Sequence, residues 1–142
     1  FRQGGRTARQ AVRQVKLLLD TCAFLWIIRD RPQASSTAVA MFRNPENEVY
    51  LSSVSAWEIA VKHRLGKLPL GDVPVRYVPS ERSKHGIASL PLGESDTLVL
   101  DKLPLLHHDP FDRMLICQAI ANQMLILTPD PLITQYPVLT RW

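Results

Sequence analysis

Residues 107–113, with the sequence His-His-Asp-Pro-Phe-Asp-Arg, run directly into the apolar block Met-Leu-Ile-Cys-Gln-Ala at 114–119. Pro110 is typical of a first helical position, because its missing N–H would have no partner there. Asp109 is then the N-cap residue, and Asp112 is the third residue of a helix that we expect to reach residue 122. Taken alone, this spacing favours a capping box, in which both acids bind free N–H groups of the first turn. The positions of the other isolated acids change that interpretation.

Short apolar runs alternate with helical patterns along the rest of the chain. The sequence predicts strands at 15–19, 48–52, 87–92, 124–127 and 137–140, and helices at 21–28, 37–43, 56–65, 75–84, 95–102, 110–122 and 132–135. We expect Ser55 to cap the 56–65 helix, with Glu58 as its third residue. Prolines and glycines between residues 66 and 86 predict a loop before a short helix. The alternation predicts an α/β sandwich around a mainly parallel sheet.

Five acidic residues fall at corresponding places in this order of elements. Asp20 follows the first predicted strand, and Asp130 follows the fourth. Glu58 lies in the first turn of the helix after the second strand, and Asp109 and Asp112 open the helix before the fourth. The ends of parallel strands and the neighbouring helix N-termini meet at one edge of a sheet, where ligands bind in open α/β folds. The sequence therefore predicts that these carboxylates converge on one cleft.

Converging carboxylates repel one another and raise each other's pKa unless a cation is present. Oxygen ligands without a Cys or His cluster indicate Mg²⁺ or Mn²⁺ in preference to zinc. Such an ion helps to deprotonate a water and neutralises charge on an attacked phosphate. We expect His107 and His108 to have a loop role, because adjacent residues rarely face one centre.

Each acid also has a purely structural interpretation. Glu58 fits a capping box and a surface pair with Lys62 as well as it fits a functional role. Asp130, between two prolines, could form a turn. Asp20 favours function, because a charge beside so apolar a run needs a partner. Arg113 could touch a phosphate, although an ion pair with a neighbouring acid is more common.

The net charge of +4 comes from the beginning of the chain. Residues 1–16 contain five of the 17 basic residues and no acid, which leaves 12 basic and 13 acidic residues elsewhere; the five are Arg2, Arg6, Arg9, Arg13 and Lys16. We expect residues 1–14 to be a disordered extension or an upstream segment without a role in the chemistry. Residues 15–142 are long enough for one domain with a real core.

The composition also bears on the compartment of the protein. No apolar run approaches the ~20 residues that span a bilayer, and the N-terminus has no apolar signal region. Cys22 and Cys117 both lie in apolar surroundings, which predicts two buried thiols and neither a disulfide nor a metal pair. We therefore expect a cytoplasmic protein without a membrane segment.

The residues that carry a family resemblance stand in four stretches. These are Leu-Leu-Leu-Asp-Thr at 17–21, Ser-Val-Ser-Ala-Trp-Glu-Ile-Ala at 53–60 with Lys67 and Leu68 after it, Leu103 and Pro104 with residues 107–116, and Thr-Pro-Asp at 128–130. In this order and spacing, the chain resembles the PIN-domain ribonucleases. Among them it is most similar to the VapC-type toxins of bacterial toxin–antitoxin pairs.

The resemblance implies a three-layer α/β/α sandwich with acids that bind Mg²⁺ or Mn²⁺ at its mouth. Asp20, Glu58, Asp112 and Asp130 match the family's acidic positions, and Asp109 belongs to the same motif and ligates directly or through water. The small hydroxyl residues beside the acids, Thr21 and Thr128, match positions that could hold the attacking water. The resemblance further implies endonucleolytic RNA cleavage, a homodimer and a cognate antitoxin that covers the acidic site.

Two other functions remain open from the residues alone. A phosphatase or a DNA nuclease of similar fold would use the same acids, because carboxylates and a metal ion do not select the substrate. A catalytically inactive partner-binding module would have lost at least one of them, whereas every matching acid is present.

Overall fold

The computed structural model describes residues 14–142, so the predicted extension 1–14 lies outside the described residues except for Gln14. Five strands form one sheet in the order β3-β2-β1-β4-β5, and every pair is parallel. The strands are β1 (Lys16–Leu19), β2 (Glu48–Ser52), β3 (Ala88–Leu90), β4 (Leu125–Leu127) and β5 (Thr140–Arg141). The expected sheet is therefore present and is parallel throughout.

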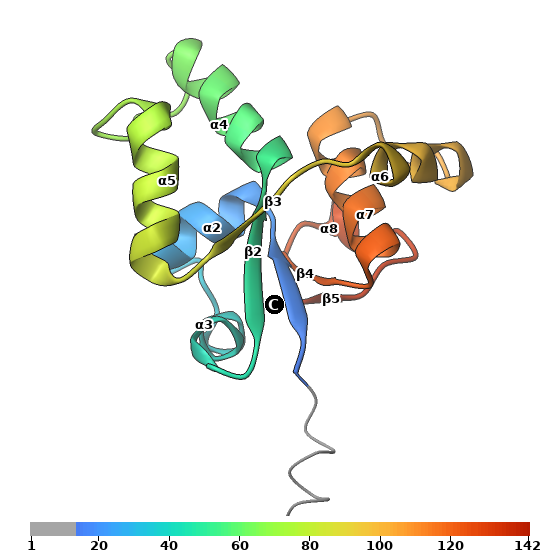
Figure 1. Cartoon of the computed structure of the whole chain (residues 1–142), viewed down its shortest axis with the longest axis horizontal. Helices are drawn as coiled ribbons and strands as arrows, with labels where there is room; N and C mark the ends of the chain where they lie inside the picture. The colour runs from blue at the N-terminus through green and yellow to red at the C-terminus, as the bar shows by residue number, and fades with distance from the viewer. Residues whose placement is uncertain (1–13) are drawn as a thin grey trace, which may run out of the picture.

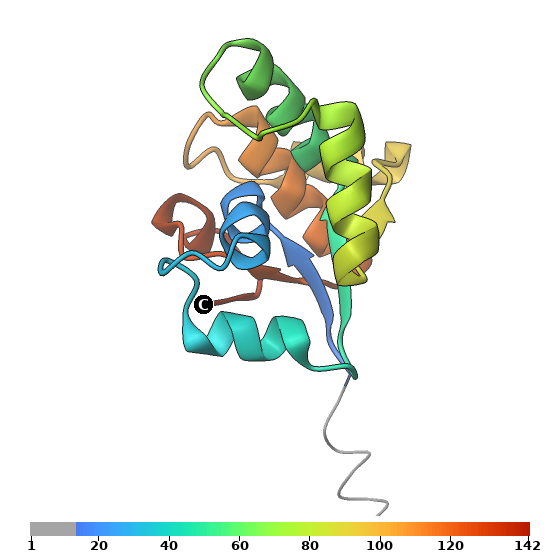
Figure 2. The same ribbon diagram turned by 90° about the vertical axis from the view of Figure 1, so that its left-hand side faces the viewer.

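Helices cover both faces of this sheet, which gives the expected three-layer α/β/α sandwich (Figure 1). The helices are α2 (Thr21–Ile28), α3 (Ser36–Arg43), α4 (Ser53–Arg64), α5 (Pro74–His85), α6 (Glu94–Leu98), the 3₁₀ helix η1 (Val99–Lys102), α7 (Pro110–Asn122) and α8 (Pro131–Thr134). Helices α2, α3 and α5 lie on one side of the sheet, and Figure 2 looks onto that side. Helices α6 and α7 lie on the other.

The side chains of β1 alternate between the two faces of the sheet, and each face has its own hydrophobic core. Leu17 and Leu19 point to one face and pack with Phe24 of α2 and Ile59 of α4. Leu18 points to the opposite face and joins the cluster built around α7. All three leucines of β1 are completely buried, as their continuous apolar run predicted.

Two helices differ from the prediction. Helix α4 begins at Ser53, because the side chain of Ser52 accepts a hydrogen bond from the N–H of Val54 and caps it. Ser55, the expected cap, is instead inside the helix, and Glu58 lies in the second turn. Helix α5 is longer than expected and contains Pro79, which removes one backbone hydrogen bond without ending the helix.

The predicted helix at 95–102 is divided into α6 and the 3₁₀ helix η1. The other elements stay close to their predicted limits, apart from the last strand. Strand β5 lies at Thr140–Arg141, toward the C-terminal end of the predicted run at 137–140. Cys117 is buried as predicted, but the prediction for Cys22 is wrong, because this residue lies on an exposed side of α2. No helix in the described part of the chain is long and apolar enough to cross a membrane.

Candidate carboxylate site

Asp20 lies at the centre of the edge where the parallel strands end. It follows β1 and is the N-cap residue of α2, with its Oδ1 accepting a hydrogen bond from the N–H of Ala23 at 2.6 Å. Its Oδ2 accepts a hydrogen bond from the hydroxyl of Thr128, the residue that follows β4. Strands β1 and β4 end in register, Leu19 beside Leu127, so the two side chains meet across the sheet edge. Only 5% of Asp20 is exposed.

Glu58 is also buried, although it lies on a helix that extends away from the sheet. Its Oε1 accepts a hydrogen bond from the hydroxyl of Thr21 at 2.6 Å, and its Oε2 is paired with Lys62. The expected pair with Lys62 is therefore present, but the capping role is not, because α4 begins five residues earlier. The bond to Thr21 ties Glu58 to the residue next to Asp20.

The two acids within residues 107–113, Asp109 and Asp112, make different hydrogen bonds. Asp109 is the N-cap residue of α7, and its Oδ1 accepts hydrogen bonds from the N–H groups of Phe111 and Asp112. The carboxylate of Asp112 does not complete a capping box. Its Oδ2 lies 3.3 Å from Nε2 of His107 instead.

Asp130 combines the turn and the site interpretations. It is the N-cap residue of the short helix α8, with its Oδ1 accepting a hydrogen bond from the N–H of Leu132 at 2.9 Å. Its own N–H donates to the hydroxyl oxygen of Thr128. Thr128 therefore links Asp130 to Asp20.

The charges of these acids act on one another. Burial raises the pKa of Asp20 to about 6, and the negative charges of Asp112 and Asp130 add to that rise against the hydrogen bonds from Thr128 and Ala23. The pKa of Asp112 is likewise raised to about 6, by burial and by the charges of Asp109, Glu58 and Asp130. All five predicted acids therefore belong to one electrostatic group.

The chemistry of this group suits a hard divalent cation. It offers carboxylate oxygens with no thiolate or imidazole cluster, and a cation would relieve the repulsion that raises the pKa of Asp20 and Asp112. Within residues 14–142, however, no three acidic, His or Cys side chains are already arranged as a compact metal-binding group. Several carboxylate oxygens are instead used for helix caps and for hydrogen bonds to threonine hydroxyls.

His107 has a role that the sequence did not predict. Its side chain is 9% exposed and lies between Asp112 and the hydroxyl of Tyr136. The hydroxyl oxygen of Tyr136 accepts hydrogen bonds from the backbone N–H groups of Leu106 and His107 and from Nη1 of Arg113. With its lone pairs engaged, the hydroxyl proton is directed at Nδ1 of His107, 2.8 Å away.

This hydrogen-bond pattern indicates which nitrogen carries the hydrogen in the neutral form of the His107 ring. Nδ1 accepts the proton of Tyr136, so Nε2 carries the ring hydrogen and presents it to Asp112. Arg113, expected to contact an acid or a phosphate, donates to the carbonyl oxygen of Pro104 at 2.9 Å and to Tyr136. These residues form a buried support behind one oxygen of Asp112.

Two further residues of α4 have surroundings that the sequence did not predict. The hydroxyl of Ser55 is fully buried and has no hydrogen-bond partner within the described chain. Trp57, beside Glu58, is 57% exposed, and its ring packs edge-on against Phe111 with centroids 4.8 Å apart. An exposed Trp and a buried, unpartnered hydroxyl are both unusual enough to need an explanation.

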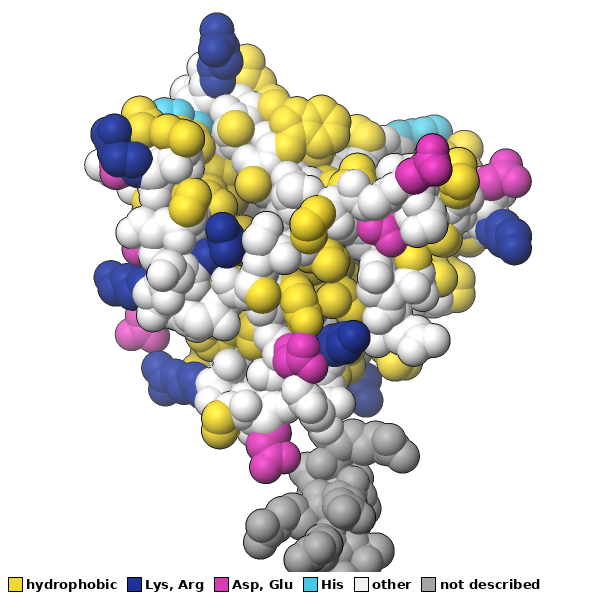
Figure 3. All heavy atoms as spheres, in the orientation of Figure 1, with side chains coloured by type: hydrophobic (Ala, Val, Ile, Leu, Met, Phe, Trp, Pro, Cys, Tyr) yellow, Lys and Arg dark blue, Asp and Glu magenta, His cyan; other side chains and the backbone are white. Residues whose placement is uncertain are grey.

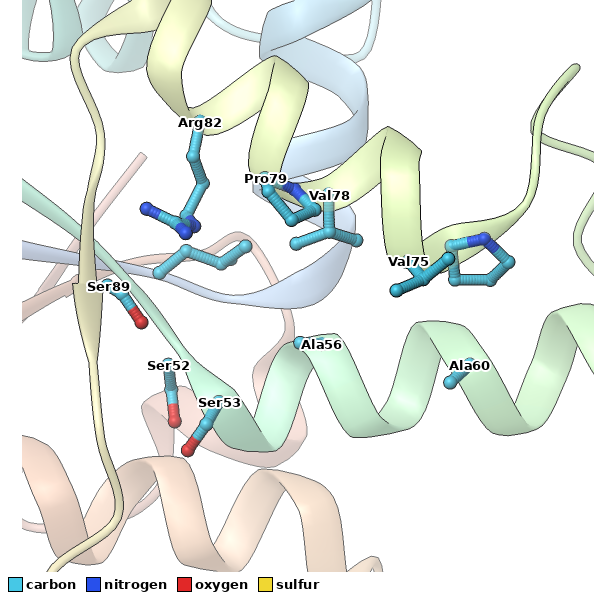
Figure 4. Close-up of a pocket in the computed structure, with 11 residues that line it drawn as sticks. Ser52, Ser53, Ala56, Ala60, Val75, Val78, Pro79, Arg82 and Ser89 are labelled. Carbon is cyan, nitrogen blue, oxygen red and sulfur yellow. The ribbon is translucent and has the colours of Figure 1, made fainter.

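A separate groove runs between α4 and α5 (Figure 4). It has a volume of about 330 Å³, and its walls are the small side chains Ala56 and Ala60 on one side and Val75 and Val78 on the other. Arg82 lies at one end. No carboxylate lines this groove, and Glu58 lies on the opposite side of α4 from Ala56 and Ala60 by helical spacing.

The sequence pattern of the PIN domain matches residues 17–138. The chain therefore belongs to the PIN-domain family, as the resemblance implied. Ribonuclease VapC16 of Mycobacterium tuberculosis is 36% identical over 70 residues, which are 46% of this chain and 50% of that protein. The chain thus matches about half the length of this relative.

Solved structures of similar fold include two VapBC structures from bacteria. The chain superposes on VapBC2 from Rickettsia felis, solved bound to a promoter DNA fragment, with a TM-score of 0.67 at 15% identity, over 89% of this chain and 98% of that one. It superposes on VapBC-1 from nontypeable Haemophilus influenzae with a TM-score of 0.60 at 16% identity, over 89% and 97%. At these identities the likeness establishes the fold.

The raised pKa of Asp20 predicts that its charge destabilises the metal-free fold. The pKa of Asp20 is about 6 in the folded protein, whereas the ordinary value is 3.8. The protonated carboxyl therefore favours the folded state, fully below pH 4, and this contribution is lost as the pH rises through 6. Asp20→Asn keeps the N-cap, since Asn caps as well as Asp. We expect it to raise the free energy of unfolding at pH 7.5 by about 1–3 kcal/mol, measured by urea denaturation in EDTA, with little difference at pH 4.

The control for this experiment is Asp101→Asn, which removes an exposed carboxylate from η1. It should leave stability unchanged at both pH values. A lower free energy of unfolding for Asp20→Asn than for the native protein at pH 7.5 would contradict the predicted destabilisation by the Asp20 charge.

Tyr136→Phe should disturb His107 without touching the acids directly. It removes the proton that Nδ1 accepts and the acceptor for two backbone N–H groups, so we expect a loss of about 1–3 kcal/mol in stability. Nitrogen NMR of the imidazole should show His107 protonated at Nε2 in the native protein and as a mixture of tautomers in the variant. Tyr50→Phe, which removes a hydroxyl bound to Glu48, should leave His107 unchanged. Protonation at Nδ1 in the native protein would refute the assignment.

Proposed function

We propose that this protein is a divalent-metal-dependent endoribonuclease of the PIN family, with Asp20, Asp112 and Asp130 as its principal metal ligands. The observation that carries the proposal is the electrostatic group at the sheet edge, where burial and neighbouring carboxylates raise the pKa of Asp20 and Asp112 to about 6. Buried acids that repel one another destabilise a fold, and a divalent cation removes that repulsion. Mg²⁺ or Mn²⁺ bound there would lower the pKa of a water and neutralise charge on the phosphate.

Other residues of the chain would orient the proposed metal ligands and the attacking water. Thr128 and the N–H of Ala23 orient Asp20, while His107 fixes one oxygen of Asp112 and leaves the other free. Asp109 and Glu58 stand next to the proposed ligands, and Glu58 is balanced by Lys62. A carboxylate whose pKa lies near neutrality is suited to accept a proton from water. The oxygen of Thr21 retains its lone pairs and could orient that water.

Ser55 joins this site in our proposal. Its buried hydroxyl lies one turn before Glu58 on the same helix and has no partner in the described chain. A buried hydroxyl without a partner costs free energy unless water or a ligand oxygen satisfies it. We assign it to a water molecule held inside the site.

We further propose that the protein is the toxin of a toxin–antitoxin pair and acts as a homodimer in the cytoplasm. Support comes from the similarity to Ribonuclease VapC16 and from the VapBC structures that share the fold.

Asp112→Asn tests the proposed chemistry. It should reduce Mn²⁺-dependent RNA cleavage by about 10²- to 10⁴-fold, because it removes both charge and a proton acceptor. The measurement is the initial rate on single-stranded RNA, compared with single-stranded DNA and a small phosphodiester. Asp101→Asn should cleave like the native protein. Undiminished cleavage by Asp112→Asn, or cleavage of DNA in preference to RNA, would overturn the proposal.

Ser55→Ala separates function from stability. The lost hydroxyl has no protein partner, so we expect the free energy of unfolding to stay the same or to rise, while cleavage falls about 5- to 30-fold. Ser52→Ala is the matched control on the same helix. It removes the N-cap of α4 and the bond to Gln118, and should cost about 1–2 kcal/mol in stability. Full activity in Ser55→Ala would remove Ser55 from the site.

A further inference from the structure

Trp57 is the exposed aromatic residue closest in sequence to a buried acid of the site. Its neighbour Glu58 is 5% exposed, whereas Trp57 is 57% exposed. Consecutive residues of a helix point about 100° apart, so one side chain enters the site while the next stays at its rim. Core packing does not explain this Trp, because most of its surface faces solvent.

The Trp57 ring is nevertheless fixed in place. It packs edge-on against Phe111 with an interplanar angle of 71°, a favourable arrangement for two aromatic rings. Phe111 lies in the first turn of α7, and its N–H is held by the Asp109 carboxylate at 2.9 Å. The two rings therefore form a defined surface and not a freely rotating side chain.

The position of this aromatic pair relative to the acids is set by the backbone. Trp57 precedes Glu58 directly, and Phe111 directly precedes Asp112. Adjacent Cα atoms are about 3.8 Å apart, so both rings are anchored beside carboxylates on the two helices that frame the site. A strand bound at the carboxylates would therefore lie within reach of these rings.

We propose that the Trp57–Phe111 pair stacks an unpaired nucleobase of the RNA, next to the phosphate that is cleaved. The proposal rests on the proposed function and narrows its substrate class to single-stranded RNA or to unpaired loops, since a base must leave its duplex to stack on a side chain. Stacking on an aromatic ring tolerates any base, because every base has a π face. Trp57 thus positions the strand without selecting its sequence.

The experiment measures RNA binding in the Asp112→Asn protein, in which we expect cleavage to be too slow to destroy the RNA during the titration. A fluorescein-labelled single-stranded RNA is titrated in Mg²⁺ and followed by anisotropy. Trp57→Ala should weaken binding about 5- to 100-fold, and Trp57→Phe should retain most of the affinity. Duplex RNA should bind equally to all three proteins. Leu65→Ala, which removes an equally exposed side chain at the end of α4, should change nothing.

A second arm locates the base that stacks. Removing single bases along the RNA should weaken binding to the Trp57-containing protein at one position, and should have no such effect in Trp57→Ala. Uniform loss at no particular position, or equal affinity of Trp57→Ala and its parent, overturns the proposal. If Trp57→Ala binds RNA normally but no longer binds an antitoxin, the surface belongs to a protein partner. Should Trp57→Ala fail to fold, Trp57→Phe and Trp57→Leu provide the same comparison.

The outcome is independent of the proposed ribonuclease chemistry. Loss of cleavage in Asp112→Asn with normal RNA binding by Trp57→Ala would refute only the stacking surface. Binding that depends on Trp57 in a protein that never cleaves RNA would refute only the chemistry.

Discussion

The hydrogen bond from Thr128 to Asp20 joins the ends of the two central strands and fixes the acid around which the edge is built. It depends on the parallel register of β1 and β4, because a shift by one residue would turn Asp20 to the other face of the sheet. Each partner follows a strand of fully or almost fully buried leucine and isoleucine side chains. The apolar layers thus hold a carboxylate in an environment where its charged form is costly.

That cost is the physical basis of the proposed activity. Ionising both Asp20 and Asp112 costs free energy, because both are buried and other carboxylates of the site lie near them. The fold tolerates this repulsion because the two cores on either side of the sheet supply the stability. A cation is attracted most strongly where the protein has concentrated unbalanced charge at low solvent exposure. Within residues 14–142, Glu58 is the one acid of the five that pairs with a Lys or Arg side chain, Lys62.

The sequence predicted best those elements whose signals are local. Helix α7 has an N-cap Asp, a proline at its first position and a continuous apolar block, and its limits are as predicted. The cap of α4 could not be chosen from the run Ser-Ser-Val-Ser, because any of its serines could serve. Strand β2 ends at Ser52 and the helix begins at the next residue, so Ser52 is the N-cap. The positions of the five acids were predictable because the ends of parallel strands share one edge.

Other features depend on contacts distant in sequence. His107 was assigned to a loop, and only its hydrogen bond to Tyr136, 29 residues away, shows that it supports Asp112. The separate tasks of Asp109 and Asp112 could not be read from their spacing, since a capping box places both acids identically. The buried and exposed states of Ser55 and Trp57 follow from how α4 packs on α7, which no local pattern encodes.

Helix α4 shows how one element can serve several surfaces without conflict. Its residues Ser55 and Glu58 turn inward, Trp57 stays at the rim, and Ala56 and Ala60 form a wall of the groove beside α5 (Figure 4). Hydrophobic side chains also run along the middle of the face shown in Figure 3, with charged side chains mostly at its edges. Because residues on different faces of a helix do not contact one another, a molecule bound in the groove would contact neither the acids nor the aromatic pair. An inhibitor that closes the site must therefore reach around α4 to the side that carries Glu58 and Trp57.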